Sequence, residues 1–421
     1  MSVRFKIVKK KLKINPAKRL ILIFLLGNLY ISIINAINLY GVTNSHDPAT
    51  IIKDGDTYWH FTTGDGIWSS KSTNLTTWSA ANMPVFPIGT FPDWIKTYVS
   101  DFSGQFWAPD IIHMNGYYYL YYSCSSWGTT KSAIGVARTL SLNEPDWEDM
   151  GMVVYSDGSS TAINAIDPGL FKDTNGKIYM TYGSFFGGIG IVEIDSVSGK
   201  TTTSVSRIYG GGHQSIEAPY LFKEGDYYYL VVNRGSCCQG VNSTYYITAG
   251  RSTNVYGPYS DWSTILANKE GKYIGPGHFG LYREGCMNYV STHYYDANQF
   301  GMAKLDILKM TFENEWPVLT REYELNDCIT GINTFSTYKV NGLIISSNPA
   351  KGNQIQFQVT DKNLENKKAD FNIYSMDGKL LYRKTNTLSE EITLNTSLNT
   401  GIYLILIKCN QQSFYSRIFI Q

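Results

Sequence analysis

The sequence predicts an all-β protein: a five-bladed β-propeller followed by a small C-terminal β-sandwich. The first observation is a recurring pattern of a proline, a short apolar run, a turn and a second run rich in aromatic and β-branched residues. The prolines of the five copies are Pro48, Pro109, Pro168, Pro219 and Pro276, with spacings of 61, 59, 51 and 57 residues by subtraction. Repeats of this length made of short strands are typical of propeller blades. The second observation is that the pattern stops near residue 335, where shorter strand-like runs with fewer aromatics continue.

The copy over residues 212–232 shows the pattern most clearly. Pro219 can open a strand but not lie inside a central one, so we expect a strand over residues 220–223. Glu224-Gly225-Asp226 is a turn sequence because glycine adopts positive φ without steric penalty. Residues 227–232 then form the partner strand. Glu217 is expected in a loop at the start of this hairpin, from which it can reach a cleft.

Three carboxylates stand at or beside the residue that precedes the proline, namely Asp47, Asp167 and Glu217. Copies two and five carry Ala108 and Gly275 there. Equivalent blade positions surround one axis, so we expect the three carboxylates to converge. An Asp before a proline often only caps a turn, yet a purely structural role would reuse one residue type in every blade. Two carboxylates across a sugar cleft suffice for glycoside hydrolysis, since one protonates the leaving oxygen and the other attacks or activates water.

The beginning of the chain predicts a secretory signal. Residues 1–19 contain eight Lys or Arg and no acid, and residues 20–26 are strongly apolar. This is the order of the n-region and h-region of a signal peptide. A short membrane anchor is the alternative, but Asn28 and Asn35 interrupt the apolar stretch. The predicted divisions are a signal segment over 1–36, the propeller over 37–335, a linker over 336–344 and the sandwich over 345–421.

Charge and cysteine content exclude some classes of protein. The net charge of +1 offers no bulk attraction for nucleic acid, and we expect a monomer. The six cysteines include no CxxC pair, which argues against a structural zinc site. The adjacent Cys237 and Cys238 form either a vicinal disulfide or two small, half-buried side chains in a loop; the sequence leaves both open.

Motifs in every blade resemble glycoside hydrolase family 43, the five-bladed arabinanases and their relatives. The motifs are HDP at 46–48, FWAPD at 106–110, NAIDPG at 164–169, YGSFFGGI at 182–189, SIEAPY at 215–220 and GPGH at 275–278. SCCQGVNSTYYI at 236–247 resembles the endo-1,5-α-L-arabinanase branch in particular. The resemblance implies that Asp47 is the general base, that Glu217 is the general acid, and that Asp167 orients the acid and adjusts its pKa. It also implies inversion, which requires about 6.5–9.5 Å between acid and base to admit a water molecule.

These roles carry an electrostatic expectation. A general acid must stay protonated near neutral pH, so the pKa of Glu217 has to be raised. We expect like-charge repulsion from Asp167 to raise it, with partial desolvation adding to the effect. Asp47, on a wetter side of the cleft, should stay ionised.

The resemblance also assigns a metal site and sugar contacts. It implies that His278 holds a metal ion on the propeller axis, calcium being expected, largely through water. A structural histidine at a hairpin start is the alternative, because calcium prefers oxygen ligands. The side chains expected to contact sugar by stacking or hydrogen bonds are Phe102, Trp107, Asn164, Ser184 and Phe185. Core packing is the alternative for Trp107.

The tail has its own resemblance. SNP at 347–349, IYSMDGKLL at 373–381 and LNTGIYLILI at 398–407 are similar to the C-terminal sorting domain of the type IX secretion system. This implies secretion or attachment to the cell surface with the type IX machinery as a partner. A carbohydrate-binding sandwich is the alternative, but the segment has no Trp to stack on sugar.

The predicted function is hydrolysis of internal α-1,5-L-arabinofuranosidic bonds in arabinan, a side chain of pectin, or in arabino-oligosaccharides. An exo-acting α-L-arabinofuranosidase or β-xylosidase on the same fold is the first alternative. A non-catalytic sugar-binding propeller is the second, and the presence of all three acids argues against it.

Overall fold

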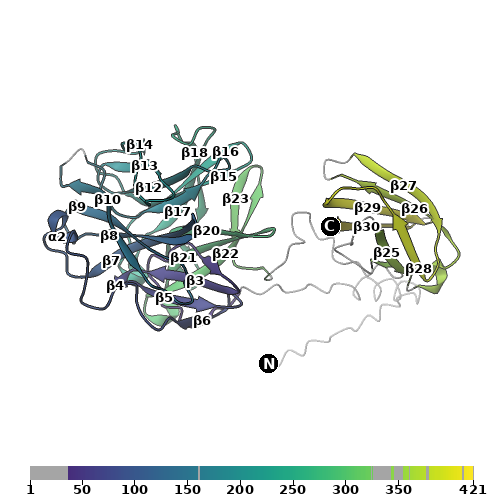
Figure 1. Ribbon diagram of the computed structural model, residues 1–421, viewed down its shortest axis with the longest axis horizontal. Coiled ribbons are helices and arrows are strands. Elements are labelled where there is room, and N and C mark those ends of the chain that lie inside the picture. The colour runs from purple at the N-terminus through teal and green to yellow at the C-terminus, as the bar shows by residue number, and fades with distance from the viewer. Residues whose placement is uncertain are drawn as a thin grey trace, which may run out of the picture. The chain divides into compact units, whose positions relative to one another are not determined.

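The computed structural model describes residues 37–159, 162–323, 325, 343–345, 354–359, 361–375, 379–409 and 412–420. The chain divides into two compact units, Met1–Cys328 and Ile329–Gln421, and strands dominate both (Figure 1). The predicted signal segment 1–36 lies outside the described residues, as does most of the predicted linker. In the part of the chain that is described, no helix is long and apolar enough to cross a membrane.

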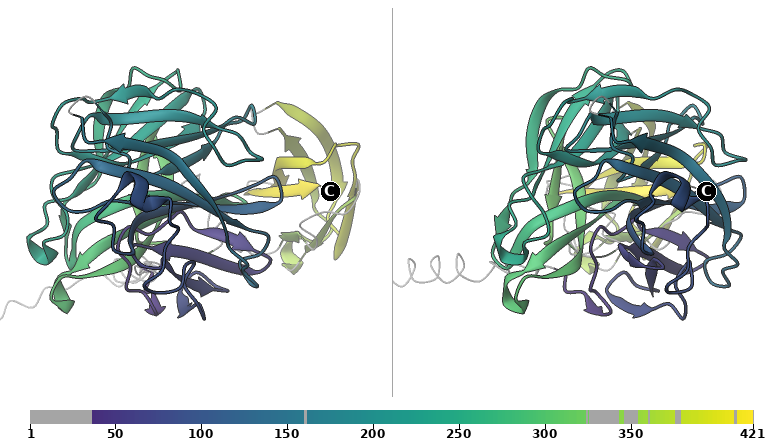
Figure 2. Two further views of the ribbon diagram at one scale, coloured as in Figure 1. Left: turned by 60° about the vertical axis from the view of Figure 1, so that its left-hand side comes forward. Right: turned by 90° about the vertical axis from the view of Figure 1, so that its left-hand side faces the viewer.

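Five sheets of four or five strands build the first unit, which confirms the predicted five-bladed propeller (Figures 1 and 2). Blade 1 has the order β1-β6-β5-β3-β2, with β1 Tyr40–Gly41, β2 Ile52–Asp54, β3 Thr57–Thr62, β5 Trp68–Ser72 and β6 Thr77–Ala80. Blade 2 has the order β10-β9-β8-β7-β4, with β4 Gly64–Asp65, β7 Gln105–Met114, β8 Tyr117–Cys124, β9 Lys131–Thr139 and β10 Glu148–Asp157. Blade 3 comprises β11 Gly169–Lys172, β12 Ile178–Ser184, β13 Gly188–Ile194 and β14 Ser206–Tyr209.

The last two blades follow the same plan. Blade 4 comprises β15 Ile216–Glu224, β16 Tyr227–Arg234, β17 Tyr246–Ser252 and β18 Ser260–Leu266. Blade 5 comprises β19 Lys269–Glu270, β20 Tyr273–Glu284, β21 Met287–Asp296, β22 Met302–Glu313 and β23 Trp316–Thr320. The described helical turns of this unit are α2 Ile95–Tyr98, η1 Gly240–Asn242 and η2 Ala297–Gln299.

The blade 4 hairpin corrects one prediction about Glu217. The turn is as expected, because Glu224 pairs with Tyr227 across it and Gly225 has φ of 55°. Glu217, however, lies within strand β15 and not in a loop, and Pro219 lies in the same strand. The register shifts between Glu217 and Tyr220. This bulge leaves the proline nitrogen outside the ladder, so its missing N–H costs no hydrogen bond.

Each blade has one non-glycine residue in the left-handed region, either within its inner strand or shortly before it. The five are Asp47 (φ 47°), Ala108 (φ 43°), Asp167 (φ 60°), Ala218 (φ 50°) and His278 (φ 61°). In blade 5 the register shifts between Gly277 and Gly280, as it does around Ala108 and Ala218. His278, and not Gly275, therefore occupies the repeated position. Alignment on the proline placed blade 5 three residues too early.

Hydrophobic clusters fill the spaces between neighbouring blades. Tyr118 packs in the cluster shared by blades 1 and 2, whereas Tyr119 packs in the one shared by blades 2 and 3. This is the alternation expected of successive strand residues. A further cluster joins Trp78 of blade 1 to Tyr289 of blade 5. The propeller thus has a distributed core that closes on itself.

The segment between β1 and β2 closes the ring. Ser45 donates its backbone N–H to the carbonyl of Ala303 at 3.2 Å, and Leu305 donates to the carbonyl of Thr43 at 2.7 Å. Both partners belong to β22 of blade 5. A few residues at the start of the ring therefore hydrogen-bond to its last blade.

The second unit is a β-sandwich, as predicted. One sheet has the order β24-β25-β28, with β24 Leu343–Ile345, β25 Gln354–Val359 and β28 Glu391–Asn395. The other has the order β27-β26-β29-β30, with β26 Lys368–Tyr374, β27 Leu380–Thr387, β29 Gly401–Cys409 and β30 Gln412–Ile420, and η3 is Lys362–Leu364. Phe357 and Phe371, one from each sheet, meet at 5.4 Å between ring centroids in a single core. The predicted turn at Asp377-Gly378 lies outside the described residues.

Candidate active site

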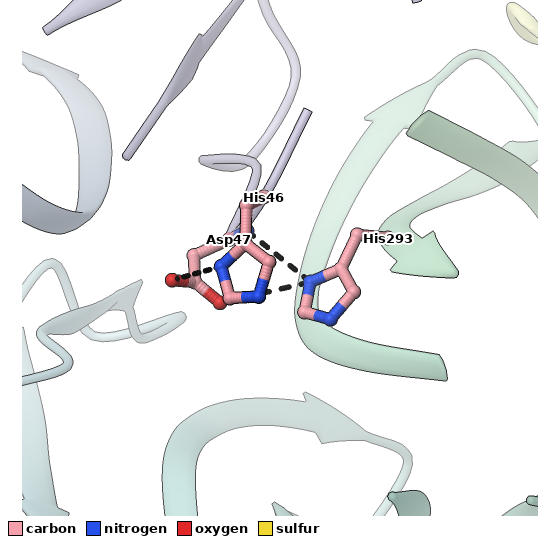
Figure 3. A group of neighbouring side chains, drawn as sticks. All are labelled: His46, Asp47 and His293. Atoms are coloured by element: carbon pink, nitrogen blue, oxygen red, sulfur yellow. Dashed lines mark hydrogen bonds and ion pairs between the residues drawn. The ribbon is translucent and has the colours of Figure 1, made fainter. Parts of the chain in front are cut away.

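Asp47 lies between blades 1 and 5 and is held on several sides (Figure 3). Its Oδ2 accepts hydrogen bonds from His46 Nδ1 at 2.8 Å and from Thr63 Oγ1 at 2.9 Å. Its backbone N–H donates to Nδ1 of His293 at 3.2 Å. Burial opposes ionisation of this carboxyl, but the charge and hydrogen bond of His46 are the main opposing causes and hold its pKa well below the usual range. Asp47 is therefore ionised, as predicted.

Asp167 lies between blades 2 and 4. Its backbone N–H donates to Ser123 Oγ at 3.0 Å, and its Oδ2 accepts the backbone N–H of Ala218 at 3.0 Å. Ala218 follows Glu217 in the chain, so Asp167 fixes the backbone that carries the third carboxylate. Burial, and then the charge of Asp47, raise the pKa of Asp167 to about 8.

Glu217 is the second residue of strand β15 and pairs with Asn233 of β16. Burial raises its pKa well above the usual range, and the charges of Asp167 and Asp47 add to the rise. The direction agrees with the sequence-based expectation, but the order of causes does not, because burial and not the neighbouring carboxylate is the larger one. These interactions also mean that the three carboxylates lie within electrostatic reach of one another.

The site therefore combines opposite protonation states in one place. Asp47 is an ionised carboxylate, which can accept a proton from water. Glu217, with a raised pKa, holds a proton that it can donate. An acid and a base of this kind are the two groups that hydrolysis of a glycosidic bond requires.

His278 completes the ring of equivalent positions. Its backbone N–H donates to Asn233 Oδ1 at 3.0 Å, and Nδ2 of the same amide donates to the carbonyl of Pro276 at 3.1 Å. The side chain is buried, and burial lowers the pKa of its imidazole. A neutral imidazole can act as a metal ligand. The described residues that have metal-like spacing are instead His46, Asp47 and His293, and hydrogen bonds already join them to one another.

The residues expected to contact sugar fall into two groups. Phe102 is 1% exposed and packs on Phe106 in the core between blades 1 and 2, so it does not line a cleft and that expectation is wrong. Asn164 and Ser184 are buried and bonded to each other at 2.9 Å, and Asn164 also accepts from Ser132. Their hydrogen-bonding groups are thus engaged within the protein.

Trp107 and Phe185 keep partly exposed rings. Trp107 packs on Trp127 with 5.6 Å between ring centroids, and Trp127 is 78% exposed. Phe185 is followed by the exposed Phe186, which packs on His213. Sugar contact through Trp107 and Phe185 stays a prediction.

Sequence reasoning missed the groups that surround Asp47. His293 and Tyr295 lie on β21 two residues apart, so they share one face of the strand and flank His46. The sequence signal for these two residues is their spacing of two within a strand of the last repeat, whose blade adjoins the one that carries the HDP motif. Cys237 and Cys238 are joined by a disulfide, which settles the two alternatives for this pair.

Comparisons with known proteins fit this site. The family model described as "Glycosyl hydrolases family 43" matches residues 42–317. The family model described as "Secretion system C-terminal sorting domain" matches residues 347–421. An extracellular exo-alpha-(1->5)-L-arabinofuranosidase of Cellvibrio japonicus is 34% identical over 68% of this chain and 88% of its own length. An extracellular endo-alpha-(1->5)-L-arabinanase of Bacillus subtilis is 38% identical over 66% of this chain and 89% of its own.

Solved structures give the same result. An exo-1,5-alpha-L-arabinanase from a bovine ruminal metagenomic library has a TM-score of 0.61 at 36% identity, covering 66% of this chain and 97% of that one. An endo-arabinanase from Bacillus licheniformis has a TM-score of 0.61 at 37% identity, covering 67% and 99%. Endo- and exo-acting proteins are thus similarly related to this chain.

Proposed function

This chain belongs to glycosyl hydrolases family 43, and from that membership we propose that it hydrolyses α-1,5-L-arabinofuranosidic bonds of arabinan with inversion, Asp47 serving as base and Glu217 as acid. The observation that carries the proposal is the opposite shift of the two pKa values: that of Asp47 is lowered and that of Glu217 is raised.

In the proposed reaction Asp47 takes a proton from a water molecule as the water oxygen bonds to the anomeric carbon. The bond from that carbon to the leaving oxygen breaks, and Glu217 gives its proton to the leaving oxygen. Asp167 holds the Ala218 N–H, which fixes the backbone beside Glu217, and its charge adds to the raised pKa of the acid. Thr63 and His46 occupy Oδ2 of Asp47, whereas His293 Nδ1 lies 3.6 Å from Oδ1, beyond hydrogen-bond distance. In the proposed reaction Oδ1 is the oxygen that takes the proton from water.

Replacing each acid by alanine tests the two roles. Asp47→Ala and Glu217→Ala should both abolish cleavage of arabinan. Glu217→Ala should keep relatively more activity on an aryl arabinoside, whose leaving group needs little protonation, whereas Asp47→Ala should lose both substrates. Azide should restore turnover in Asp47→Ala by forming a β-arabinosyl azide. Equal loss of both substrates in Glu217→Ala would remove its assignment as the acid.

We further propose that cleavage is internal. The second and third strands of the five blades are joined by residues 63–67, 125–130, 185–187, 235–245 and 297–301. Because neighbouring strands are antiparallel, these connections lie at the end of the blades where the inner strands begin, around the acids. Four of the five have six residues or fewer, which favours low walls there. Trp127, Phe186 and Phe300 are exposed on three of them, and aromatic faces of this kind stack on sugar rings.

The product profile on debranched arabinan at early times distinguishes internal from terminal cleavage. Internal cleavage gives rapid loss of viscosity and oligomers of mixed length. Free arabinose as the sole early product, with viscosity almost unchanged, would make the enzyme exo-acting, as the Cellvibrio relative is named.

We also propose a metal ion, calcium, held by His278 and water. The buried, neutral imidazole fits one ligand position, and a divalent ion there would place positive charge near the carboxylate of Asp47, which interacts with His278. Calorimetric titration of chelator-treated protein with calcium should give a single site that His278→Ala abolishes. Unchanged binding in that variant would locate the ion elsewhere.

The two ends of the chain support export. We propose that residues 1–36 direct the chain to the Sec pathway and that the sorting domain over 347–421 then passes it to type IX machinery, for release or surface attachment.

A further inference from the structure

The ring of His46 makes contacts at both of its nitrogens and on one face. Nδ1 lies 2.8 Å from Asp47 Oδ2, and Nε2 lies 2.8 Å from Tyr295 Oη. A carboxylate only accepts hydrogen bonds, so Nδ1 carries the proton and donates it. One ring face stacks on His293 at 4.4 Å with an interplanar angle of 20° (Figure 3). The imidazole is thus fixed in orientation by groups from blade 5, although it belongs to blade 1.

Tyr295 is in turn held by the disulfide loop. Its Oη accepts the backbone N–H of Cys238 at 2.8 Å, and Cys238 Sγ lies 3.8 Å from His46 Nε2. Cys238 has φ of 67°, a conformation that is uncommon for a non-glycine residue. The bond between Cys237 and Cys238 restricts the peptide between them and so fixes the direction of this N–H. Gln239, the next residue, donates to Ser243 Oγ at 3.0 Å and anchors the other side of the loop.

These contacts form one continuous path from the disulfide to a catalytic carboxylate. It runs from the Cys238 N–H to Tyr295 Oη, to His46 and to Asp47 Oδ2. Thr63 occupies the same carboxylate oxygen. The orientation of Asp47, and hence of the oxygen left for water, depends on this path.

We propose that His46 is a positioning residue for Asp47, and that the Cys237–Cys238 disulfide, acting through Tyr295, holds His46 in place. The proposal rests on the proposed role of Asp47 as base. His46 does not touch the reacting atoms; it fixes the carboxylate. Reduction by a dithiol transfers two electrons and two protons to the disulfide, giving two cysteine thiols and the oxidised, cyclic reagent. The peptide is then free to rotate, and the Cys238 N–H is no longer constrained to meet Tyr295.

Two amide substitutions at position 46 separate positioning from packing. His46→Asn places an N–H near the position of Nδ1 and can still donate to Asp47. His46→Gln places its amide near the position of Nε2 and can reach Tyr295 but not Asp47. We expect His46→Gln to lower kcat on arabinan roughly 10- to 100-fold with little change in KM, since small misplacements of catalytic groups have effects of this size. His46→Asn should stay within a few-fold of the unaltered enzyme. An equal fall of kcat in both variants, or a change in KM alone, would overturn the positioning role of His46.

The disulfide is tested in the full chain. Tyr295→Phe and the double variant Cys237→Ser/Cys238→Ser should each lower kcat without changing KM. Dithiothreitol should lower kcat of the unaltered enzyme to the level of the double variant and leave the double variant unaffected. That last measurement is the control for Cys286, which is also disulfide-bonded. Full kcat in the double variant would contradict the proposal. A fall of kcat on adding dithiothreitol to the double variant would also contradict it.

A measurement that does not use turnover separates this proposal from the proposed function. In protein labelled with ¹⁵N-histidine, the Nδ1–H of His46 should give a slowly exchanging proton signal, identified by its loss in His46→Asn. The signal should broaden in Tyr295→Phe and after reduction. A signal that responds in this way in a protein without arabinan hydrolysis would contradict the proposed function and leave the path standing. An unchanged signal after reduction in an active enzyme would contradict the path alone.

Discussion

At the scale of single residues, three carboxylates differ through what surrounds them. Asp47 has imidazoles and a hydroxyl around it, and its pKa is lowered. Asp167 is buried and Glu217 is partly buried, both with few donors, and their pKa values are raised. The sequence could predict that these acids meet, because a repeat places equivalent residues around an axis. It could not predict that burial is the larger cause at Glu217, because burial depends on how whole blades pack.

The pKa shifts lead to a prediction about pH. Ionisation of Glu217 ends activity on the alkaline side, and the charge of Asp167 helps to delay that ionisation. Replacing Asp167 by Asn removes a like charge, so the pKa of Glu217 should fall and the alkaline limb of kcat/KM should move to lower pH. The pKa of Glu217 should stay above that of an ordinary Glu in this variant, because burial still raises it.

The control for this measurement is Asp173→Asn, since Asp173 is also buried but bonds to Tyr228 Oη away from the site. An alkaline limb that stays in place in Asp167→Asn, or moves equally in both variants, would contradict the assignment.

At the scale of elements, the inner strands share a backbone plan while their side chains differ. Hairpin turns and strand alternation were predictable because they depend on a few adjacent residues. The proline does not predict the position of blade 5, because the feature that repeats is the left-handed residue with its bulge. Phe102 was misassigned for a related reason: the packing of residues 81–104 over blade 2, and not local sequence, decides which aromatic is buried.

One inner-strand side chain joins three blades. Asp110 of β7 is buried; its Oδ1 accepts the Thr50 N–H of blade 1 at 2.9 Å, and its Oδ2 accepts the Leu170 N–H of blade 3 at 2.7 Å. Burial raises its pKa to about 6. The Asp110 carboxylate thus links the strands on either side of it.

Blades 3 and 4 also pack closely. Gly169, two residues after the left-handed position of blade 3, has no room for a side chain, since a Cβ there would lie 2.3 Å from the carbonyl oxygen of Pro219.

Removing the Asp110 link should destabilise the propeller. Asp110→Ala leaves two buried N–H groups without partners, at a cost of roughly 2–5 kcal/mol in the free energy of unfolding. Urea unfolding of the isolated protein at pH 7 measures it. Asp226→Ala, in the exposed turn of blade 4, is the matched control and should change the same free energy by less than about 0.5 kcal/mol. Equal stability of the two variants would mean that water replaces the carboxylate.

At the scale of the whole molecule, the two units have separate cores. The sandwich cluster draws only on residues from Ile355 to Ile420, and the described propeller clusters end at Leu325. The change in composition near residue 335 was enough to predict two units, because the residues that form a core set the pattern of apolar side chains over long stretches of sequence. The contact of residues 43–45 with β22 was not predicted, because so short a segment carries no periodic signal.

Separate cores predict that truncation after residue 340 leaves a folded, active enzyme. Its thermal midpoint and kcat/KM on arabinan should match those of the propeller in the full chain. In the native host the truncated protein should accumulate in the periplasm, since it lacks the sorting domain. Normal secretion of the truncated chain would contradict the sorting role, and loss of folding would contradict the independence of the propeller.

The hydrogen bonds between residues 43–45 and β22 make closure of the ring a long-range event. Asn44 and Lys304 are 260 residues apart in the chain, and a contact between residues so far apart has a high cost in loop-closure entropy. Closure of the ring also completes the pocket of Asp47, because that pocket draws on both ends of the ring.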